Sequence, residues 1–204
     1  MNIFLYVLDT LADWEISYLV AEINSGRYFK KDIVRPKIVK VGNDLKAIKT
    51  MGGIEIKPDI DVDNLNLTNN DLLLLPGGDT WLNGKNQKII DFIKKNESIN
   101  VAAICGATMA LAENGLLDNR RHTSNDLGYL KMVCKNYMGQ ALYEYKPAVA
   151  EKNLITASGI APLEFSYEVL KKLDVMKSDT LEAWYGLYKF QEAKYFFALM
   201  KSME

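Results

Sequence analysis

The segment Asn100-Val101-Ala102-Ala103-Ile104-Cys105-Gly106-Ala107-Thr108-Met109-Ala110-Leu111 decides the fold. An apolar run stops at Cys105 and a helix-forming run begins at once, so the segment predicts a strand that turns directly into a helix. The residues on both sides of Cys105 are small, as a sharp strand-to-helix turn requires, because the helix must pack close to the strand. The pattern is the cysteine version of a nucleophile elbow. A buried, inert cysteine at such a junction would leave the same pattern.

The position of Cys105 predicts a reactive sulfur. At the carboxyl end of a strand and the amino end of a helix, unpaired backbone N–H groups and the helix dipole favour a thiolate over a thiol. We therefore expect a lowered pKa for Cys105. The other cysteine, Cys134, fits the core face of a helix, and we expect it to be inert.

Similar short apolar runs recur along the chain and are separated by segments with apolar residues at helical spacing. Continuous apolarity is typical of strands that are covered on both faces, as in a parallel sheet between helices. The alternation predicts an α/β protein with a doubly wound, mostly parallel sheet. The predicted strands are residues 3–8, 38–41, 72–75, 101–104 and 154–157, and the clearest helical segments between them are 14–23 and 89–93.

Several element ends can also be predicted. Asn114-Gly115 indicates a left-handed helix end, and Pro162 indicates the first turn of a helix that runs to about Leu173. The segment 179–182 has capping-box spacing and predicts one long, aromatic-rich helix at the C-terminus. The residues beside Lys146-Pro147 suggest an antiparallel edge. No linker divides the chain, so we expect a single domain over residues 1–204, with 179–204 as a helical extension.

Composition narrows the function classes. The 204 residues contain 25 Lys and Arg against 26 Asp and Glu, a balance that predicts no binding to nucleic acid or to an anionic membrane surface. Two cysteines and one histidine are too few for a usual zinc site, so we expect no metal and no cofactor. No run is apolar enough to span a bilayer, and the N-terminus lacks the pattern of a signal peptide. We expect a cytoplasmic protein with a small-molecule substrate.

A second motif ends at the same edge of the predicted sheet. The apolar run 72–75 leads into Pro76-Gly77-Gly78-Asp79, and the chain between Gly78 and Cys105 is long enough for one crossover helix. The backbone N–H groups of Gly78 and Gly106 would then form a two-donor pocket for an oxyanion. A simple tight turn is the alternative explanation.

An acidic residue completes the candidate site. Glu15 lies in the first turn of the helix that follows the first strand. Burial would raise its pKa until the carboxyl group is protonated near neutrality and donates a hydrogen bond to a thiolate. The alternative is an ordinary acid at a helix N-terminus, where it interacts favourably with the dipole.

The ordered set of these motifs resembles the ThiJ/PfpI family of the class I glutamine amidotransferase-like superfamily, from about Asn2 to Leu173. The resemblance implies a flavodoxin-like sandwich, a reactive Cys105, Glu15 as its acidic partner, Gly78 and Gly106 as oxyanion donors, and a homodimer. Its motifs are, in order, Glu15, Met51-Gly52-Gly53, Lys57-Pro58-Asp59, Asp71 to Gly78, Ala102 to Ala107, Gly115-Leu116-Leu117, Thr156-Ala157-Ser158-Gly159 and Glu164-Phe165.

The sequence also departs from that family's patterns. Peptidase-like members carry a histidine directly after the cysteine, where this chain has Gly106, and no histidine follows His122. The departures argue against a functional glutamine amidotransferase and against a peptidase. Other members have a histidine at the position that looks like Asn125 here. Strand alternation would point His122 and Asn125 to opposite faces, which favours a structural or surface role for His122 over a role in the site.

These features predict a cysteine-dependent small-molecule enzyme: a hydrolase, a hydratase or a glyoxalase-like enzyme. It would use the Cys105 thiolate and the Glu15 carboxyl group. A redox-sensing or stress-response protein whose Cys105 is oxidised is the first alternative, and a non-catalytic binding module is the second. The candidate residues that line the pocket are Asp79, Trp81, His122, Asn125 and Tyr129.

Overall fold

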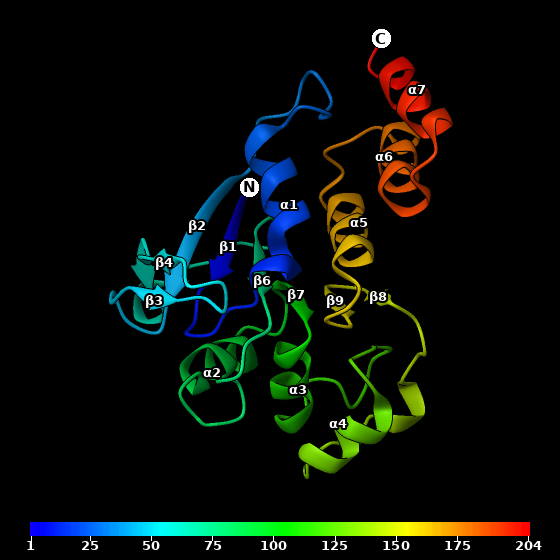
Figure 1. Cartoon of the computed structure of the whole chain (residues 1–204). Helices are drawn as coiled ribbons and strands as arrows, with labels where there is room; N and C mark the ends of the chain where they lie inside the picture. Colours follow the sequence, from blue (N-terminus) through cyan, green and yellow to red (C-terminus); the bar gives the residue numbers. More distant parts are fainter.

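A seven-stranded sheet lies between helices in the computed structural model, which describes all residues from 1 to 204 (Figure 1). The strand order is β5-β2-β1-β6-β7-β9-β8, and every neighbouring pair is parallel except β8 with β9. The strands are β1 (Asn2–Tyr6), β2 (Lys37–Gly42), β5 (Ile60–Asp61), β6 (Leu72–Leu75), β7 (Asn100–Ile104), β8 (Ala148–Glu151) and β9 (Leu154–Ala157), with β3 (Ile48–Lys49) and β4 (Glu55–Ile56) as a separate hairpin.

Helices cover both faces of this sheet. The chain leaves β1 toward β2 on one side and continues from β6 to β7 on the other, so right-handed crossovers place α1 and α2 on opposite faces. Helices α1 and α5 pack against each other on one of these faces. The helices are α1 (Asp13–Ser25), α2 (Gln87–Lys95), α3 (Gly106–Glu113), α4 (Leu127–Val133), α5 (Pro162–Leu173), α6 (Ser178–Phe190) and α7 (Ala193–Ser202), with the 3-10 turns η1 (Val62–Asn64) and η2 (Gln140–Leu142).

The predicted α/β architecture is confirmed. All four leucines of β6 are buried, as are the last four residues of β1 and β7, because helices cover both faces of these strands. One contiguous core of 47 buried residues runs from Ile3 to Leu199. No helix is both long and apolar enough to cross a membrane.

Most predicted element ends agree with the structure. Strands β6 and β9 and helix α5 have the predicted bounds, Gly115 has a positive φ of 74°, and β8 forms the predicted antiparallel edge. Strand β1 ends earlier than predicted because Val7 and Leu8 leave the strand while remaining buried.

The prediction of one long C-terminal helix is wrong. The chain instead forms α6 and α7, which pack against each other as a helical pair at one end of the molecule (Figure 1). The break falls at Gln191, whose φ of 58° is left-handed and ends α6. Glycine at position 186 allows α7 to fold back against α6, because the Cβ atom of any other residue there would lie 2.3 Å from the ring of Tyr195. The predicted capping box does not form, since α6 begins at Ser178.

Candidate active site

Cys105 lies at the junction between β7 and α3 with a strained backbone. Its φ of 58° and ψ of −123° are rare for a residue with a side chain and cost about 1–3 kcal/mol. Three hydrogen bonds hold the turn: the Cys105 N–H donates to the Ala157 carbonyl at 3.0 Å, and the Cys105 carbonyl accepts from the N–H and the hydroxyl of Thr108, at 3.0 and 2.6 Å. The sharp elbow expected from the sequence is therefore present.

The two predicted oxyanion donors lie side by side. A Cβ atom on Gly106 would be 2.8 Å from the carbonyl oxygen and 3.4 Å from the nitrogen of Gly78, so only glycine at position 106 allows the loop after β6 to come this close. The Gly78 N–H donates to no acceptor in the protein. The Gly106 N–H is at the start of α3, where no preceding turn of helix accepts it. The Gly78 N–H is therefore free, and the Gly106 N–H is directed at the Cys105 sulfur.

Glu15 is fully buried in the first turn of α1 and lies beside Cys105. Its Oε2 accepts a hydrogen bond from the Gly77 N–H at 2.6 Å, and its Oε1 is buried without a partner. A Cβ atom on Gly159 would lie 2.6 Å from the Cys105 sulfur and 3.1 Å from Oε1, so both atoms face the same glycine. The structure thus brings together the carboxyl group and the thiol that the sequence paired.

The pKa of the thiol differs from the sequence-based prediction. Burial and then the charge of Glu15 raise the pKa of Cys105 to about 11, although N–H donors from Asn125 and Gly106 act in the opposite direction. The expected lowering by the helix N-terminus is wrong because partial burial of the sulfur, together with the nearby Glu15 charge, penalises the thiolate more than the N–H donors favour it. Burial also raises the pKa of Glu15, in the predicted direction. Both shifts disfavour negative charge in the site, and with a pKa of about 11 the Cys105 sulfur keeps its proton at neutral pH.

Asn125 has a fixed orientation in the site. Its Oδ1 accepts a hydrogen bond from the Gly159 N–H at 2.8 Å, which leaves the Nδ2 group facing the Cys105 sulfur at 3.4 Å. Because the backbone N–H can only donate, the amide cannot be reversed without losing this bond. Asn125 therefore lines the pocket, as expected from the sequence, and its amide N–H group donates to the sulfur.

His122 does not reach the pocket, contrary to its inclusion among the candidate lining residues. The ring is buried, Nδ1 donates to the Arg120 carbonyl at 2.8 Å, and Nε2 accepts from the Tyr137 hydroxyl at 2.6 Å. Burial lowers its pKa. Both nitrogens are thus engaged away from Cys105. The predicted strand at His122 is reduced to a single bridge with Tyr143.

A cavity of about 320 Å³ opens over Cys105. It includes the predicted lining residues Asp79, Trp81, Asn125 and Tyr129 together with Glu15. Sequence reasoning missed the part of the wall supplied by Trp14, Met51, Leu82 and Met109. Trp14 directly precedes Glu15, and this adjacency was the signal that could have identified it.

Sequence reasoning also missed two glycines that pack against the Cys105 and Glu15 side chains. Gly159 lies against both side chains. A Cβ atom on Gly77 would be 2.6 and 2.7 Å from the Glu15 oxygens and 2.8 Å from the Cys105 Cβ. Both glycines lie in motifs that carry the family resemblance, but those motifs alone did not indicate any contact with Cys105 or Glu15. No three His, Cys, Asp or Glu side chains are grouped so that they could hold a metal ion.

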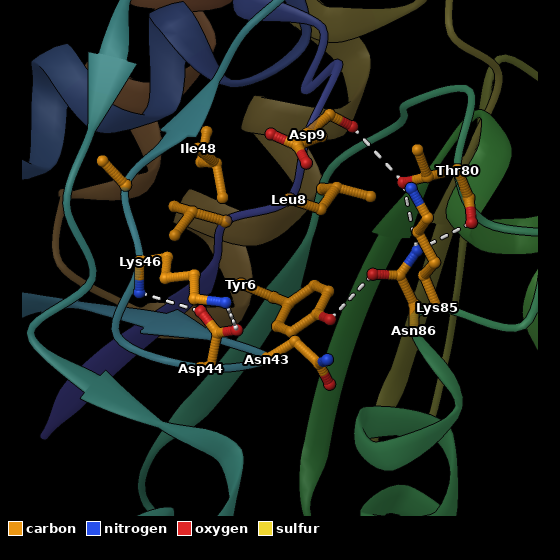
Figure 2. Close-up of a pocket in the computed structure, with 12 residues that line it drawn as sticks. Tyr6, Leu8, Asp9, Asn43, Asp44, Lys46, Ile48, Thr80, Lys85 and Asn86 are labelled. Carbon is orange, nitrogen blue, oxygen red and sulfur yellow. Dashed lines mark hydrogen bonds and ion pairs between the residues drawn. The ribbon is translucent and has the colours of Figure 1, made fainter.

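A second cavity, of about 290 Å³, is lined by Tyr6 (Figure 2). The Tyr6 ring contacts Trp81, which lines the Cys105 cavity, with 5.6 Å between ring centroids. The Tyr6 hydroxyl donates to Asn86 Oδ1 at 2.8 Å, and Figure 2 shows Lys46 and Lys85 on opposite sides of this cavity. It contains no thiol, and burial raises the pKa of Tyr6. Of the two cavities, only the one over Cys105 therefore contains a thiol.

Comparisons with known proteins agree with this geometry. The model of the DJ-1/PfpI family matches residues 1–172. The chain is 54% identical over 206 residues to "Uncharacterized protease YoaZ" of Bacillus subtilis (strain 168), covering 99% of this chain and 97% of the relative. It is 35% identical over 191 residues to "Uncharacterized protease YdeA" of the same organism, covering 90% and 91%. A crystal structure of a thiJ/pfpI family protein from Bacillus anthracis has a TM-score of 0.96 and 55% identity, covering 99% of this chain and 96% of that one.

Proposed function

The chain belongs to the DJ-1/PfpI family, and from this premise we propose that it is a cysteine-dependent enzyme that acts on a small electrophilic molecule. The observation that carries the proposal is the pair of half-buried Cys105 and fully buried Glu15 beside the free N–H of Gly78. A strained nucleophile, a base and an oxyanion donor at one point are the parts that nucleophilic catalysis requires.

The first step is an addition to a carbonyl carbon. The Glu15 carboxylate takes the proton of the Cys105 thiol as the sulfur forms a bond to that carbon. The carbonyl π pair moves onto oxygen, where the N–H groups of Gly78 and Gly106 stabilise the negative charge. The Glu15 carboxyl group then returns its proton to this oxygen or to a leaving group. Hydrolase and glyoxalase-like reactions share this step, and a hydratase would begin with the corresponding addition to a nitrile-like carbon, where the π pair moves onto nitrogen and takes the proton.

The site supports a small molecule over a peptide as the substrate. Glu15 is the only acid–base side chain at the sulfur, because both nitrogens of His122 are engaged elsewhere. A cysteine–histidine proton relay of the peptidase kind has no counterpart here. The cavity of about 320 Å³ is at the small end of the range for small-molecule sites.

The redox-sensing hypothesis receives less support from the site. A sensor cysteine reacts with peroxide as the thiolate, whereas burial and the Glu15 charge hold the Cys105 pKa at about 11. Mild peroxide should therefore oxidise Cys105 slowly. Rapid, reversible oxidation, detected by mass spectrometry, would favour the sensor instead.

Turnover tests the proposal directly. Wild type is incubated with a panel of 2-oxoaldehydes, thioesters and nitriles, beside Cys105→Ser, Glu15→Gln and the control Cys134→Ser. The control keeps a hydroxyl in place of the Cys134 thiol, which donates to the Met109 carbonyl at 3.3 Å. We expect Cys105→Ser and Glu15→Gln to lose at least a hundredfold in kcat/KM and the control to retain it. Turnover that survives in Cys105→Ser would contradict the proposal, and no turnover of any compound would favour the binding module.

A further inference from the structure

The charged groups of the Cys105 cavity are all acidic. Of its thirteen lining residues, only Glu15 and Asp79 carry a carboxyl group, and none is Lys, Arg or His. Asp79 is exposed, and its carboxylate makes no hydrogen bond or ion pair with the protein. The loop is held in place by its backbone, since the Asp79 N–H donates to the Thr10 hydroxyl at 2.8 Å. An unneutralised carboxylate therefore lies directly after the oxyanion donor Gly78.

The rest of the wall is mainly apolar. Trp81 is buried, and its Nε1 donates to the Pro76 carbonyl at 2.8 Å, so the ring has no polar group left for a ligand. Trp14, Met51, Leu82 and Met109 line the same cavity. Lysines line the Tyr6 cavity instead, where Figure 2 shows Lys46 and Lys85. The Cys105 cavity thus has no cationic side chain that could form an ion pair with a carboxylate or a phosphate.

We propose that Asp79 makes this cavity selective for uncharged or cationic carbonyl compounds that carry an apolar group, and against compounds that carry a carboxylate or a phosphate. An anionic substrate would place its charge near Asp79 and near Glu15, and sulfur addition would form an oxyanion beside them. Like charges within one cavity of about 320 Å³ repel, and no cationic side chain in its wall offsets the repulsion. The substrate class rests on the proposed function, whereas the charge selection itself concerns any electrophile that reaches Cys105.

Charged thiol reagents test the selection without requiring turnover. Three methanethiosulfonates of similar size, with an ammonium, a hydroxyl or a sulfonate end, are reacted with Cys105 at low ionic strength. Each rate is measured by mass spectrometry and divided by the rate of the same reagent with 2-mercaptoethanol. The variants are Asp79→Asn, Asp79→Glu and the control Glu97→Gln, which makes the same charge change just before β7, at the opposite end of that strand from Cys105.

We expect wild type to prefer the cationic reagent and Asp79→Asn to lower the ratio of cationic to anionic rates about fivefold. Asp79→Glu should keep the preference, Glu97→Gln should not change it, and about 1 M salt should abolish the difference between wild type and Asp79→Asn, because the Debye length falls to about 3 Å. Equal ratios in wild type and Asp79→Asn would overturn the charge selection.

A turnover arm separates this inference from the proposed function. The kcat/KM values of a cationic and an anionic 2-oxoaldehyde are compared in wild type and Asp79→Asn, and we expect the wild-type preference for the cation to shrink about as much as in labelling. Selective labelling without turnover of any carbonyl compound would overturn the enzyme proposal and its substrate class while supporting the charge selection. Turnover that favours the anionic compound would overturn the inference and leave the enzyme proposal in place.

Discussion

Replacing Glu15 with Gln removes the negative charge beside the Cys105 sulfur and keeps the size of the side chain. That charge is one of the causes that raise the pKa of Cys105 to about 11. We therefore expect Glu15→Gln to lower the Cys105 pKa. The expected direction follows from the sign of the interaction, because a neighbouring carboxylate disfavours formation of a second negative charge.

The magnitude follows from the geometry of the pair. The sulfur and Oε1 face each other at Gly159, and two unit charges ~5 Å apart at an effective dielectric constant of ~20 repel by about 3 kcal/mol, or about 2 pKa units. Burial is the larger cause of the shift and remains in the variant. We expect the pKa to fall by about 1 to 2 units, so that the thiolate fraction at pH 8 rises at least about tenfold.

Alkylation kinetics measure this change. The rate of reaction of Cys105 with iodoacetamide is followed by mass spectrometry between pH 6 and about 11, with Cys134 quantified separately in the same samples. Thermal unfolding checks that Glu15→Gln remains folded. An unchanged or raised pKa in the variant would refute the reasoning, since it would mean that Glu15 is protonated at rest and donates to a thiolate, as the sequence alone suggested.

Three further predictions concern the rest of the site and the assembly. Asn125→Ala removes an N–H donor to the sulfur, so we expect a higher Cys105 pKa and slower alkylation at pH 8, measured as above; a lowered pKa would contradict the contact at 3.4 Å. Gly159→Ala places a Cβ atom 2.6 Å from the sulfur, so we expect a loss of about 1–3 kcal/mol in the free energy of unfolding and a displaced thiol, read from urea denaturation and alkylation; an unchanged stability and alkylation rate would contradict this close contact. We also propose a homodimer, so sedimentation should give twice the chain mass of 23.1 kDa, and a monomer at micromolar concentration would contradict it.

Local patterns predicted the parts of the fold that depend on local sequence. The leucines of β6 and the small residues around Cys105 define a buried strand and an elbow without reference to any distant residue. Helix α5 likewise begins at Pro162, whose fixed φ suits a first helical turn. The break between α6 and α7 was missed because it depends on Tyr195 packing over Gly186, a contact that helical periodicity does not encode.

The candidate site shows the same limit. Motif order brought Cys105, Glu15, Gly78 and Gly106 together, and the structure agrees. Motif order did not reveal that Gly159 would lie against the sulfur, because that contact depends on the register of β9 beside β7. The direction of the Cys105 pKa shift was also beyond the sequence, since helix dipole and burial oppose each other and only the exposure of the sulfur decides between them.

The raised pKa gives Glu15 two effects that a single variant can separate. With a pKa of about 11, roughly one Cys105 sulfur in ten thousand is a thiolate at pH 7, so attack without a base would lose most of the available rate. Glu15 offsets this loss by taking the proton during attack, while its charge keeps the resting thiol protonated. Glu15→Gln should therefore speed alkylation near neutral pH and slow turnover. If both rates rise, Glu15 acts only through its charge; if both fall, Glu15 is protonated at rest and stabilises the thiolate by donating to it.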